Sequence, residues 1–506
     1  MPSYFCLDPK VETMRYIPIF LFLAMLVVPA SAATEVPADP PSVLWIMLDD
    51  GRADALGSYG RSWALPPHMD RIASAGIHFE SAIVQNPVCI PSRTSMKASL
   101  YAHETGIMAM GKPAQPRGLY RKKVLPHYPS LLKLWKKAGI QPKNVGKLHA
   151  FSQDWLQHGN PPADLDSHGK PTKHLRLKWR DRLLSRVLTK THEWMIGGLL
   201  DIPASGVEDV PRAVERLRQL TATNQPFSLR VSFHAPHVAC HISPSHYVDP
   251  NRIDLPLPTA AELIKKPRYE RENIHIYGGA PDLTTEQIQL ARGTYYGMIR
   301  LVDDQVGKLL RVLEESNRLS DTIIVINSDQ GFQLREHGVW KKRDFYDSNV
   351  RVPFIMSASG RLPAGNVVQK PVEMVDFLPT LLELSGFDPP DNIRGRSLLP
   401  LILGEMQQWR PACFSEHDYS EDAYDELRKD GGRRVMVRTQ EWKLVFLMDQ
   451  RIQHQERSLY NLRRDPDEQD NLAGDPAYAA PWKSWRRWHT AGIGAAEPPT
   501  NRPPRI

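Results

Sequence analysis

Acidic and amide side chains follow two predicted strands, and together they have the chemistry of a metal site. Asp49 and Asp50 come directly after one apolar run, and Asp329 and Gln330 come shortly after another. Adjacent carboxylates at the end of a buried strand are costly unless positive charge neutralises them. A turn or cap accounts for one acid there, but less well for a pair. Three carboxylates and an amide oxygen suit Ca²⁺ or Mg²⁺ rather than Zn²⁺, which prefers nitrogen and sulfur ligands.

The segment from Cys89 to Arg93 has the composition of an anion site. Pro91 is typical of the first turn of a helix, and the N–H groups at a helix N-terminus attract anions. The Arg93 guanidinium adds a forked donor that matches a tetrahedral oxyanion. The alternative interpretation of Cys89 is a buried structural thiol, which is the usual environment of a lone cysteine.

Basic and imidazole side chains elsewhere supply candidate acids, bases and charge-neutralising groups. Lys147 and His149 lie at the end of a predicted short strand, and His237 follows a longer apolar run. Lys342 belongs to a basic stretch that a solvated turn would explain equally well. A lone histidine is more often a surface or core residue than a catalytic one, so none of these positions identifies a site alone.

Predicted strands alternate with predicted helices, which indicates an α/β domain with a mostly parallel sheet. Ligand sites in such sheets form beyond the carboxyl ends of the strands. Each of the three predicted strands delivers an acid or a histidine at that end. The expected strands are 43–48, 227–233 and 322–326, and the expected helices are 67–75, 130–138, 210–220 and 285–315.

A second, smaller region is predicted to begin near residue 407. Residues 434–438 and 442–447 have the composition of strands, which indicates an antiparallel sheet. We therefore expect a main domain at 41–406, a C-terminal α+β subdomain at 407–490 and a loose, proline-rich tail at 491–506.

The N-terminal residues 1–32 have the pattern of a signal peptide. A short basic start precedes an apolar stretch, and the small residues at positions 30–32 fit a cleavage site. The apolar stretch is short for a membrane span, so we expect an exported protein, periplasmic or secreted, rather than an anchored one. We expect no stable membrane insertion and no nucleic-acid partner.

The composition of the chain excludes few classes of function. The 506-residue chain carries a net charge of +7, which is compatible with an anionic polymer but is weak evidence for one. The segment 167–194 is rich in Lys, Arg and His and reads either as a solvated segment or as a basic rim for such a polymer. Cys89, Cys240 and Cys413 would remain after cleavage, so the chain is not a disulfide scaffold.

The motifs occur in an order that resembles the sulfatase family. The pentapeptide from Cys89 to Arg93 matches the sulfatase signature, and the resemblance covers roughly residues 41 to 475. Each motif alone is modest evidence, whereas the ordered set is specific. The other matching segments are 48–50, 67–76, 146–149, 232–237, 302–307, 328–331, 336–338, 352–354, 376–380, 459–460 and 465–472.

The resemblance implies an alkaline-phosphatase-like fold, with helices on both faces of the sheet and a smaller C-terminal domain. It implies that a maturation enzyme oxidises Cys89 to formylglycine, an aldehyde that hydrates to a gem-diol. It also implies a calcium site, with magnesium the weaker alternative. The ligands implied are Asp49, Asp50, Asp329, Gln330 and the modified Cys89.

The implied reaction is hydrolysis of sulfate monoesters, with a sulfated carbohydrate as the expected substrate. One gem-diol oxygen would attack sulfur and form a covalent sulfate ester. Arg93, Lys147 and Lys342 would offset the negative charge of the ester. His237 or Lys342 would protonate the departing alcohol, and His149 would take the proton that allows sulfate to leave.

Two departures from the family pattern keep alternatives open. Ala98-Ser99 stands where the family usually has Thr-Gly, which puts efficient maturation in doubt. Gln330 replaces the usual His or Asn, which puts its role as a ligand in doubt. The alternatives are a phosphonate or phosphate monoester hydrolase of the same superfamily and a non-catalytic protein that binds sulfated glycans.

Overall fold

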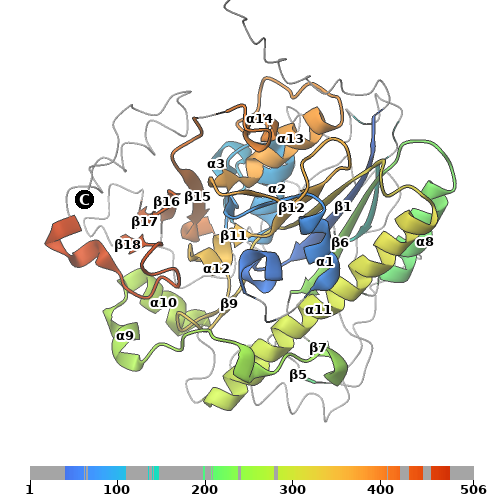
Figure 1. Cartoon of the computed structure of the whole chain (residues 1–506). Coiled ribbons are helices and arrows are strands. Elements are labelled where there is room, and N and C mark those ends of the chain that lie inside the picture. Colours follow the sequence, from blue (N-terminus) through green and yellow to red (C-terminus); the bar gives the residue numbers. More distant parts are fainter. Residues whose placement is uncertain are drawn as a thin grey trace, which may run out of the picture. The chain divides into compact units, whose positions relative to one another are not determined.

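The computed structural model in Figure 1 describes most of the chain between residues 40 and 478. The predicted signal peptide 1–32, His149, the basic segment 167–194, Cys240 and the tail 491–506 lie outside the described residues. The described residues are 40–61, 63, 66–109, 135, 140, 142–147, 198–199, 207, 209–237, 241–277, 283–406, 408–421, 432–447 and 457–478.

A seven-stranded sheet carries the strand ends singled out in the sequence. The strand β1 pairs in parallel with β6 on one side and with β8 on the other, and β4 also runs parallel to β6. The strand β12 is antiparallel to β8, so the sheet is mixed but parallel around β1. In spatial order the strands are β13 (Asn366–Val368), β2 (Ile77–Phe79), β12 (Phe354–Ser357), β8 (Thr322–Ser328), β1 (Ser42–Asp49), β6 (Ser228–Pro236) and β4 (Pro142–Gly146).

Helices cover both faces of this sheet, and β1 contributes to the core on each side. Successive side chains of a strand point to opposite faces. The residues at positions 44, 46 and 48 join the core formed with α1, α8 and α11, while those at 43, 45 and 47 join the core formed with α2 and α13. The bounds of these helices are α1 Pro67–Ser74, α8 Val210–Thr221, α11 Thr285–Glu315, α2 Cys89–Ala98 and α13 Phe377–Leu384.

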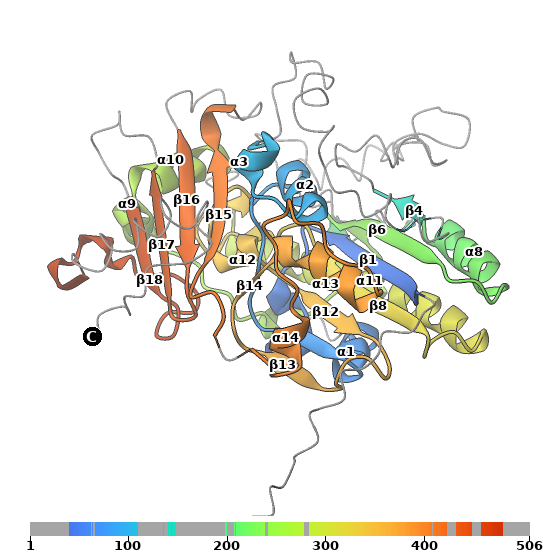
Figure 2. The ribbon, with the colours of Figure 1, turned by 90° about the horizontal axis from the view of Figure 1, so that it is seen from above.

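The C-terminal region forms a four-stranded antiparallel sheet, seen in orange and red in Figure 2. Its strands are β15 (Cys413–Asp418), β16 (Arg433–Arg438), β17 (Trp442–Leu447) and β18 (Arg457–Asn461). Short strands pair as β11 (Arg351–Val352), β3 (Ala82–Ile83) and β14 (Val372–Glu373), as β10 (Trp340–Lys341) with β9 (Gln333–Leu334), and as β5 (Gly198–Leu199) with β7 (His241–Ile242). The remaining α-helices are α3 (Ala102–Thr105), α9 (Ala260–Lys265), α10 (Arg268–Tyr277), α12 (Asp347–Val350) and α14 (Leu399–Ile402).

The expected fold class is confirmed. The three predicted strands occur as β1, β6 and β8, and the predicted helices 67–75, 210–220 and 285–315 occur as α1, α8 and α11. Of the expected helix 130–138, only Trp135 lies in the described part of the chain. The domain limits near residue 407 stay a prediction. Among the residues that the structure describes, no helix is both long and apolar enough to span a bilayer.

Buried charges connect the C-terminal sheet to α12. The Asp347 carboxylate accepts hydrogen bonds from the Arg438 guanidinium at 3.0 and 2.9 Å. The Lys443 ammonium lies 2.6 Å from Asp347 and 2.7 Å from Glu468. Burial alone would raise the pKa of Asp347, but Arg438 and then Lys443 outweigh it and hold the pKa well below its usual range.

The Asp347 network predicts an acid-sensitive part of the protein's stability. A folded-state pKa below the unfolded value of about 3.9 makes Asp347 stabilising above that value, and the contribution is lost as the pH falls below it. We expect Asp347→Asn to lower the free energy of unfolding at neutral pH by about 3 kcal/mol, because it leaves buried cations without their carboxylate. The difference from the wild type should shrink as the pH falls below about 4.

Urea titrations at a series of pH values measure this difference. Asp304→Asn is the control, because Asp304 is exposed and pairs with a partly exposed His246, and an exposed ion pair contributes only about 0–1 kcal/mol. A constant difference between wild type and Asp347→Asn from neutral pH to strong acid would contradict the assignment.

Candidate active site

The ends of two adjacent strands bring the predicted acids together. In the pairing of β1 with β8, Leu48 lies opposite Ser328, so Asp49–Asp50 and Asp329–Gln330 leave the sheet side by side. All four side chains belong to fully buried residues. The chain bends at Asp50, whose φ of 65° is a left-handed conformation that Asp adopts more readily than most residues.

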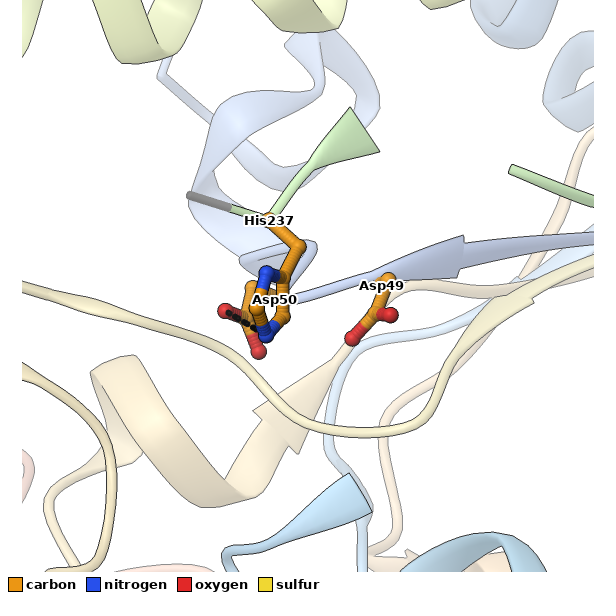
Figure 3. Close-up of side chains that lie close together, drawn as sticks. All are labelled: Asp49, Asp50 and His237. Carbon is orange, nitrogen blue, oxygen red and sulfur yellow. Dashed lines mark ion pairs between the residues drawn. The ribbon is translucent and has the colours of Figure 1, made fainter. Parts of the chain in front are cut away.

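Hydrogen bonds hold the strained turn at Asp50 in place. The Asp50 N–H donates to Asp329 Oδ1 at 3.2 Å, and the Tyr295 hydroxyl donates to the Asp50 carbonyl at 2.6 Å. Tyr295 comes from α11, so the longest helix of the fold fixes the acidic turn from one side. Figure 3 shows the Asp50 carboxylate beside the His237 ring, with Asp49 on the neighbouring strand end.

Three cations face the three carboxylates. The Arg93 Nε–H donates to Asp329 Oδ2 at 2.5 Å, and its Nη2 lies 3.6 Å from Asp49 Oδ2. Lys147 forms an ion pair with Asp49, and the Lys342 ammonium lies 2.5 Å from Asp50 Oδ1.

Two cations reach the acids from elements next to the strand ends. Arg93 lies one turn into α2, and Lys147 directly follows β4. The Lys147 N–H donates to the Ser232 carbonyl on β6 at 2.8 Å, which fixes its backbone beside the neighbouring strand.

Cys89 starts α2 and is 1% exposed. Burial raises the pKa of its thiol above the ordinary value, although Lys342 and then Lys147 act in the opposite direction. The thiolate is the reactive form of cysteine, so an unmodified Cys89 would be protonated at neutral pH and a weak nucleophile. Cys89 lies one turn before Arg93 on α2, and both Ser92 and Arg93 of this helix donate hydrogen bonds to Asp329, so the helix start lies beside the charged cluster.

The charge states of the other groups follow from burial and neighbours. Burial would raise the pKa of Asp49, but Lys147 and further basic groups hold it well below its usual range. Burial raises the pKa of Asp50 to about 6 despite the attraction of Lys342. Burial would lower the pKa of Lys342, but Asp50 and the other acids raise it, so Lys342 stays charged.

His237 follows β6 and is half-buried. Burial and the charge of Lys147 lower its pKa well below the ordinary value, so it is neutral at neutral pH. Its Nε2 lies 3.9 Å from Asp50 Oδ2.

The donor set fits a hard divalent cation. Ligand atoms of Asp49, Asp50 and His237 all lie within 4.8 Å of one another (Figure 3). Within the described residues, the buried atoms Asp50 Oδ2 and Gln330 Oε1 have no hydrogen-bond partner. The Gln330 amide N–H groups donate to Asp50 Oδ1 and, at 3.4 Å, to Asp49 Oδ1. Turning that amide over would bring its oxygen beside two carboxylates, which is favourable only with a cation between them.

Of the predicted site residues, His149 lies outside the described part of the chain. Ion pairs and hydrogen bonds join the other charged and amide residues of the predicted site, and Cys89 lies one turn before Arg93 on α2. Three neighbours on β6 had not been predicted. Ser232 Oγ accepts hydrogen bonds from Arg93 at 3.1 Å and from Arg230 at 3.2 Å. His234 is exposed, and its ring centroid lies 4.8 Å from that of His237. The sequence did contain a pattern that could have revealed them. Arg230, Ser232 and His234 alternate with apolar residues, so they share one face of a strand whose other residues belong to the core.

Comparison with known protein families identifies the family to which the chain belongs. The sequence model described as "Sulfatase" matches residues 41–387. The chain belongs to the sulfatase family. A second model, described as "N-sulphoglucosamine sulphohydrolase, C-terminal", matches residues 335–487. The protein is therefore a sulfuric ester hydrolase, as the order of its motifs predicted.

Individual relatives agree with this assignment. An arylsulfatase of Clostridium perfringens is 27% identical, and the match covers 87% of this sulfatase and 91% of the relative. An N-acetylglucosamine-6-O-sulfatase of Bacteroides thetaiotaomicron is 25% identical, with 87% and 84% covered. The solved phosphonate monoester hydrolase of Agrobacterium radiobacter shares the fold, with a TM-score of 0.71, 22% identity and coverage of 89% and 95%. This likeness confirms the alkaline-phosphatase-like fold.

Proposed function

We propose that this sulfatase hydrolyses sulfate esters of a carbohydrate, with the oxidised form of Cys89 as nucleophile and a calcium ion beside it. One observation carries the proposal: three carboxylates and three cations converge at the carboxyl ends of β1 and β8, beside the start of α2 that carries Cys89. The raised pKa of the Cys89 thiol supports the need for oxidation, because burial leaves the unmodified side chain poorly reactive.

Formylglycine at position 89 would supply a hydrated aldehyde, with one hydroxyl to attack sulfur and a second whose deprotonation releases sulfate. Asp49, Asp50, Asp329 and Gln330 would hold calcium together with the modified side chain, and the ion would supply positive charge for binding the sulfate group. Maturation would require a partner enzyme that generates formylglycine.

The chain's own residues would bind the ester and move protons. Arg93, Lys147 and Lys342 would neutralise the sulfate oxygens, since all three are cations held at the same site. Lys342 or the neighbouring His237 would donate a proton to the departing alcohol. His149 would take the proton that allows sulfate to leave.

The proposal of a carbohydrate substrate is based on the similar proteins and on the matching family models. A sugar sulfatase aligns along 87% of the chain, and the C-terminal match is to a family named for sulfoglucosamine. We therefore propose a sulfated amino sugar as the first substrate to test. Export to the periplasm or medium is proposed from the N-terminal pattern 1–32.

Turnover of matched esters tests the function. Purified, matured protein would be assayed with an aryl sulfate, an aryl phosphate and an aryl phosphonate that share one leaving group, and with N- and 6-O-sulfated glucosamine. We expect kcat/KM for the sulfate to exceed that for the phosphonate by at least about tenfold, which is about 1.4 kcal/mol at the transition state. Sulfated glucosamine should be turned over best, because contacts to the sugar add binding energy.

Two results would replace this proposal with an alternative. Faster cleavage of the phosphonate than of every sulfate would identify a phosphonate hydrolase. Mass spectrometry of the Cys89 peptide from the native host is the second measurement. An intact thiol in all molecules, together with sulfated-glycan binding and no sulfate release, would identify a binding protein.

A further inference from the structure

The segment 342–347, which carries Lys342, is held by the C-terminal region at several points. The Lys443 ammonium donates to the Phe345 carbonyl at 2.8 Å, and Asp347 is bound by Arg438 and Lys443. The contact nearest to Lys342 along the chain comes from Tyr419, whose hydroxyl donates to the Arg343 carbonyl. The C-terminal region therefore fixes the backbone of the segment 342–347, whose Lys342 side chain forms an ion pair with Asp50.

The backbone at Arg343 is strained and needs such support. Its φ of 96° lies in the left-handed region, which costs a residue other than glycine about 1–3 kcal/mol unless its surroundings hold it. Arg343 joins two fixed points, because the Lys342 ammonium lies 2.5 Å from Asp50 and the Asp344 carboxylate accepts from Asn349 at 2.6 Å. A change in its φ would turn the Lys342 side chain away from the site.

Tyr419 is well placed to provide that support. It directly follows β15, is 1% exposed and packs edge-on against His417, with ring centroids 4.7 Å apart at 82°. The Arg434 guanidinium lies over the same ring at 5.9 Å. A ring confined in this way holds its hydroxyl in one position, so the hydrogen bond to the Arg343 carbonyl fixes the backbone next to Lys342.

We propose that Tyr419 is a positioning residue for Lys342: its hydroxyl holds the strained Arg343 peptide so that the ammonium meets the sulfate group. The inference rests on the proposed function, which gives Lys342 its role. In this proposal Tyr419 acts through the backbone at Arg343, whose carbonyl accepts its hydroxyl, and not by binding the substrate itself.

A double-mutant cycle tests whether Tyr419 acts through Lys342. Tyr419→Phe keeps the ring and removes the hydroxyl, and we expect it to lower kcat on a sulfated sugar about tenfold while KM changes little. In the Lys342→Met background the same change should have less than about a twofold effect, because independent sites add and coupled sites do not. Each rate is divided by the fraction of molecules in which Cys89 is oxidised.

A matched control separates positioning from general packing. The Tyr59 hydroxyl also donates to a backbone carbonyl, that of Phe354 at 3.1 Å, outside the charged cluster. Tyr59→Phe should leave kcat near the wild-type value and lower the melting temperature about as much as Tyr419→Phe. An equal loss of kcat from Tyr419→Phe in both Lys342 backgrounds would overturn the proposal, as would no loss at all.

Binding of inorganic sulfate gives a second readout that needs no turnover. Calorimetry on the same four proteins should show weaker sulfate binding in Tyr419→Phe than in the wild type, and no further weakening in the Lys342→Met background. If the wild type cleaves no sulfate ester, the proposed function fails, and this binding cycle still decides the role of Tyr419. If Tyr419→Phe weakened sulfate binding equally with and without Lys342, the positioning role of Tyr419 would be refuted.

Discussion

Replacing Cys89 with serine is expected to end multiple turnover, with kcat lower by about 10⁶-fold, the size seen when an enzyme loses its nucleophile. Serine has a single hydroxyl, so it can accept a sulfo group but lacks the second hydroxyl that would expel sulfate. The variant should bind its substrate normally, because Arg93, Lys147 and Lys342 are unchanged.

A rapid-mixing assay and intact-mass measurement check this expectation together. At most one sulfate equivalent should be transferred per protein, and the protein should gain the mass of one sulfo group. Cys413→Ser is the matched control, because Cys413 is also a buried thiol but lies in the C-terminal strand β15. The control should keep its kcat. Sustained turnover by Cys89→Ser would refute the role of the oxidised cysteine.

Removal of the proposed calcium ion is expected to stop catalysis and to destabilise the fold. Three fully buried carboxylates, at Asp49, Asp50 and Asp329, gain a counter-ion when the metal binds. A ligand at a hundred times its dissociation constant stabilises the folded state by about 2.7 kcal/mol, provided that it does not bind the unfolded chain. We expect a chelator to lower the melting temperature and calcium to restore both stability and activity.

Paired Asp→Asn variants make this test specific. Asp329 lies in the charged cluster, whereas Asp303 is also buried but accepts the N–H groups of His68 and Met69 at 3.1 and 2.7 Å, at the start of α1. Calcium should raise the melting temperature of the wild type and of Asp303→Asn, and it should leave Asp329→Asn unchanged. Calcium-independent activity after exhaustive chelation would exclude a metal role. Full recovery with magnesium alone would exclude calcium as the required ion.

The parts of the site that sequence could predict are those set by local pattern. A buried apolar strand followed by Asp49 and Asp50 places both acids at a sheet edge, and the parallel pairing with β8 brings Asp329 beside them. Cys89 and Arg93 were predicted at a helix start because helix N-termini have recognisable residues. These assignments required only the positions of the strand ends and of one helix start. They also required the rule that ligand sites form beyond the carboxyl ends of parallel strands.

Other parts depend on contacts that no local pattern encodes. The hydrogen bond from Tyr419 to Arg343 joins residues 76 positions apart in the sequence, and neither residue shows any periodicity that would reveal it. The hydrogen bond from Arg93 to the Ser232 hydroxyl depends on how α2 packs over the sheet. The orientation of the Gln330 amide is decided by charge balance among three acids, which a sequence pattern does not contain.

The place of β1 in the sheet has a consequence for biosynthesis. It is the first strand of the described chain, yet its partners β6 and β8 are both made later. At about 5–20 residues per second, an unprotected apolar strand would wait on the order of tens of seconds for residue 328 to emerge from the ribosome. Until both neighbours arrive, this unpaired apolar segment is prone to pair with other chains, so the late arrival of β8 makes the nascent chain prone to aggregation.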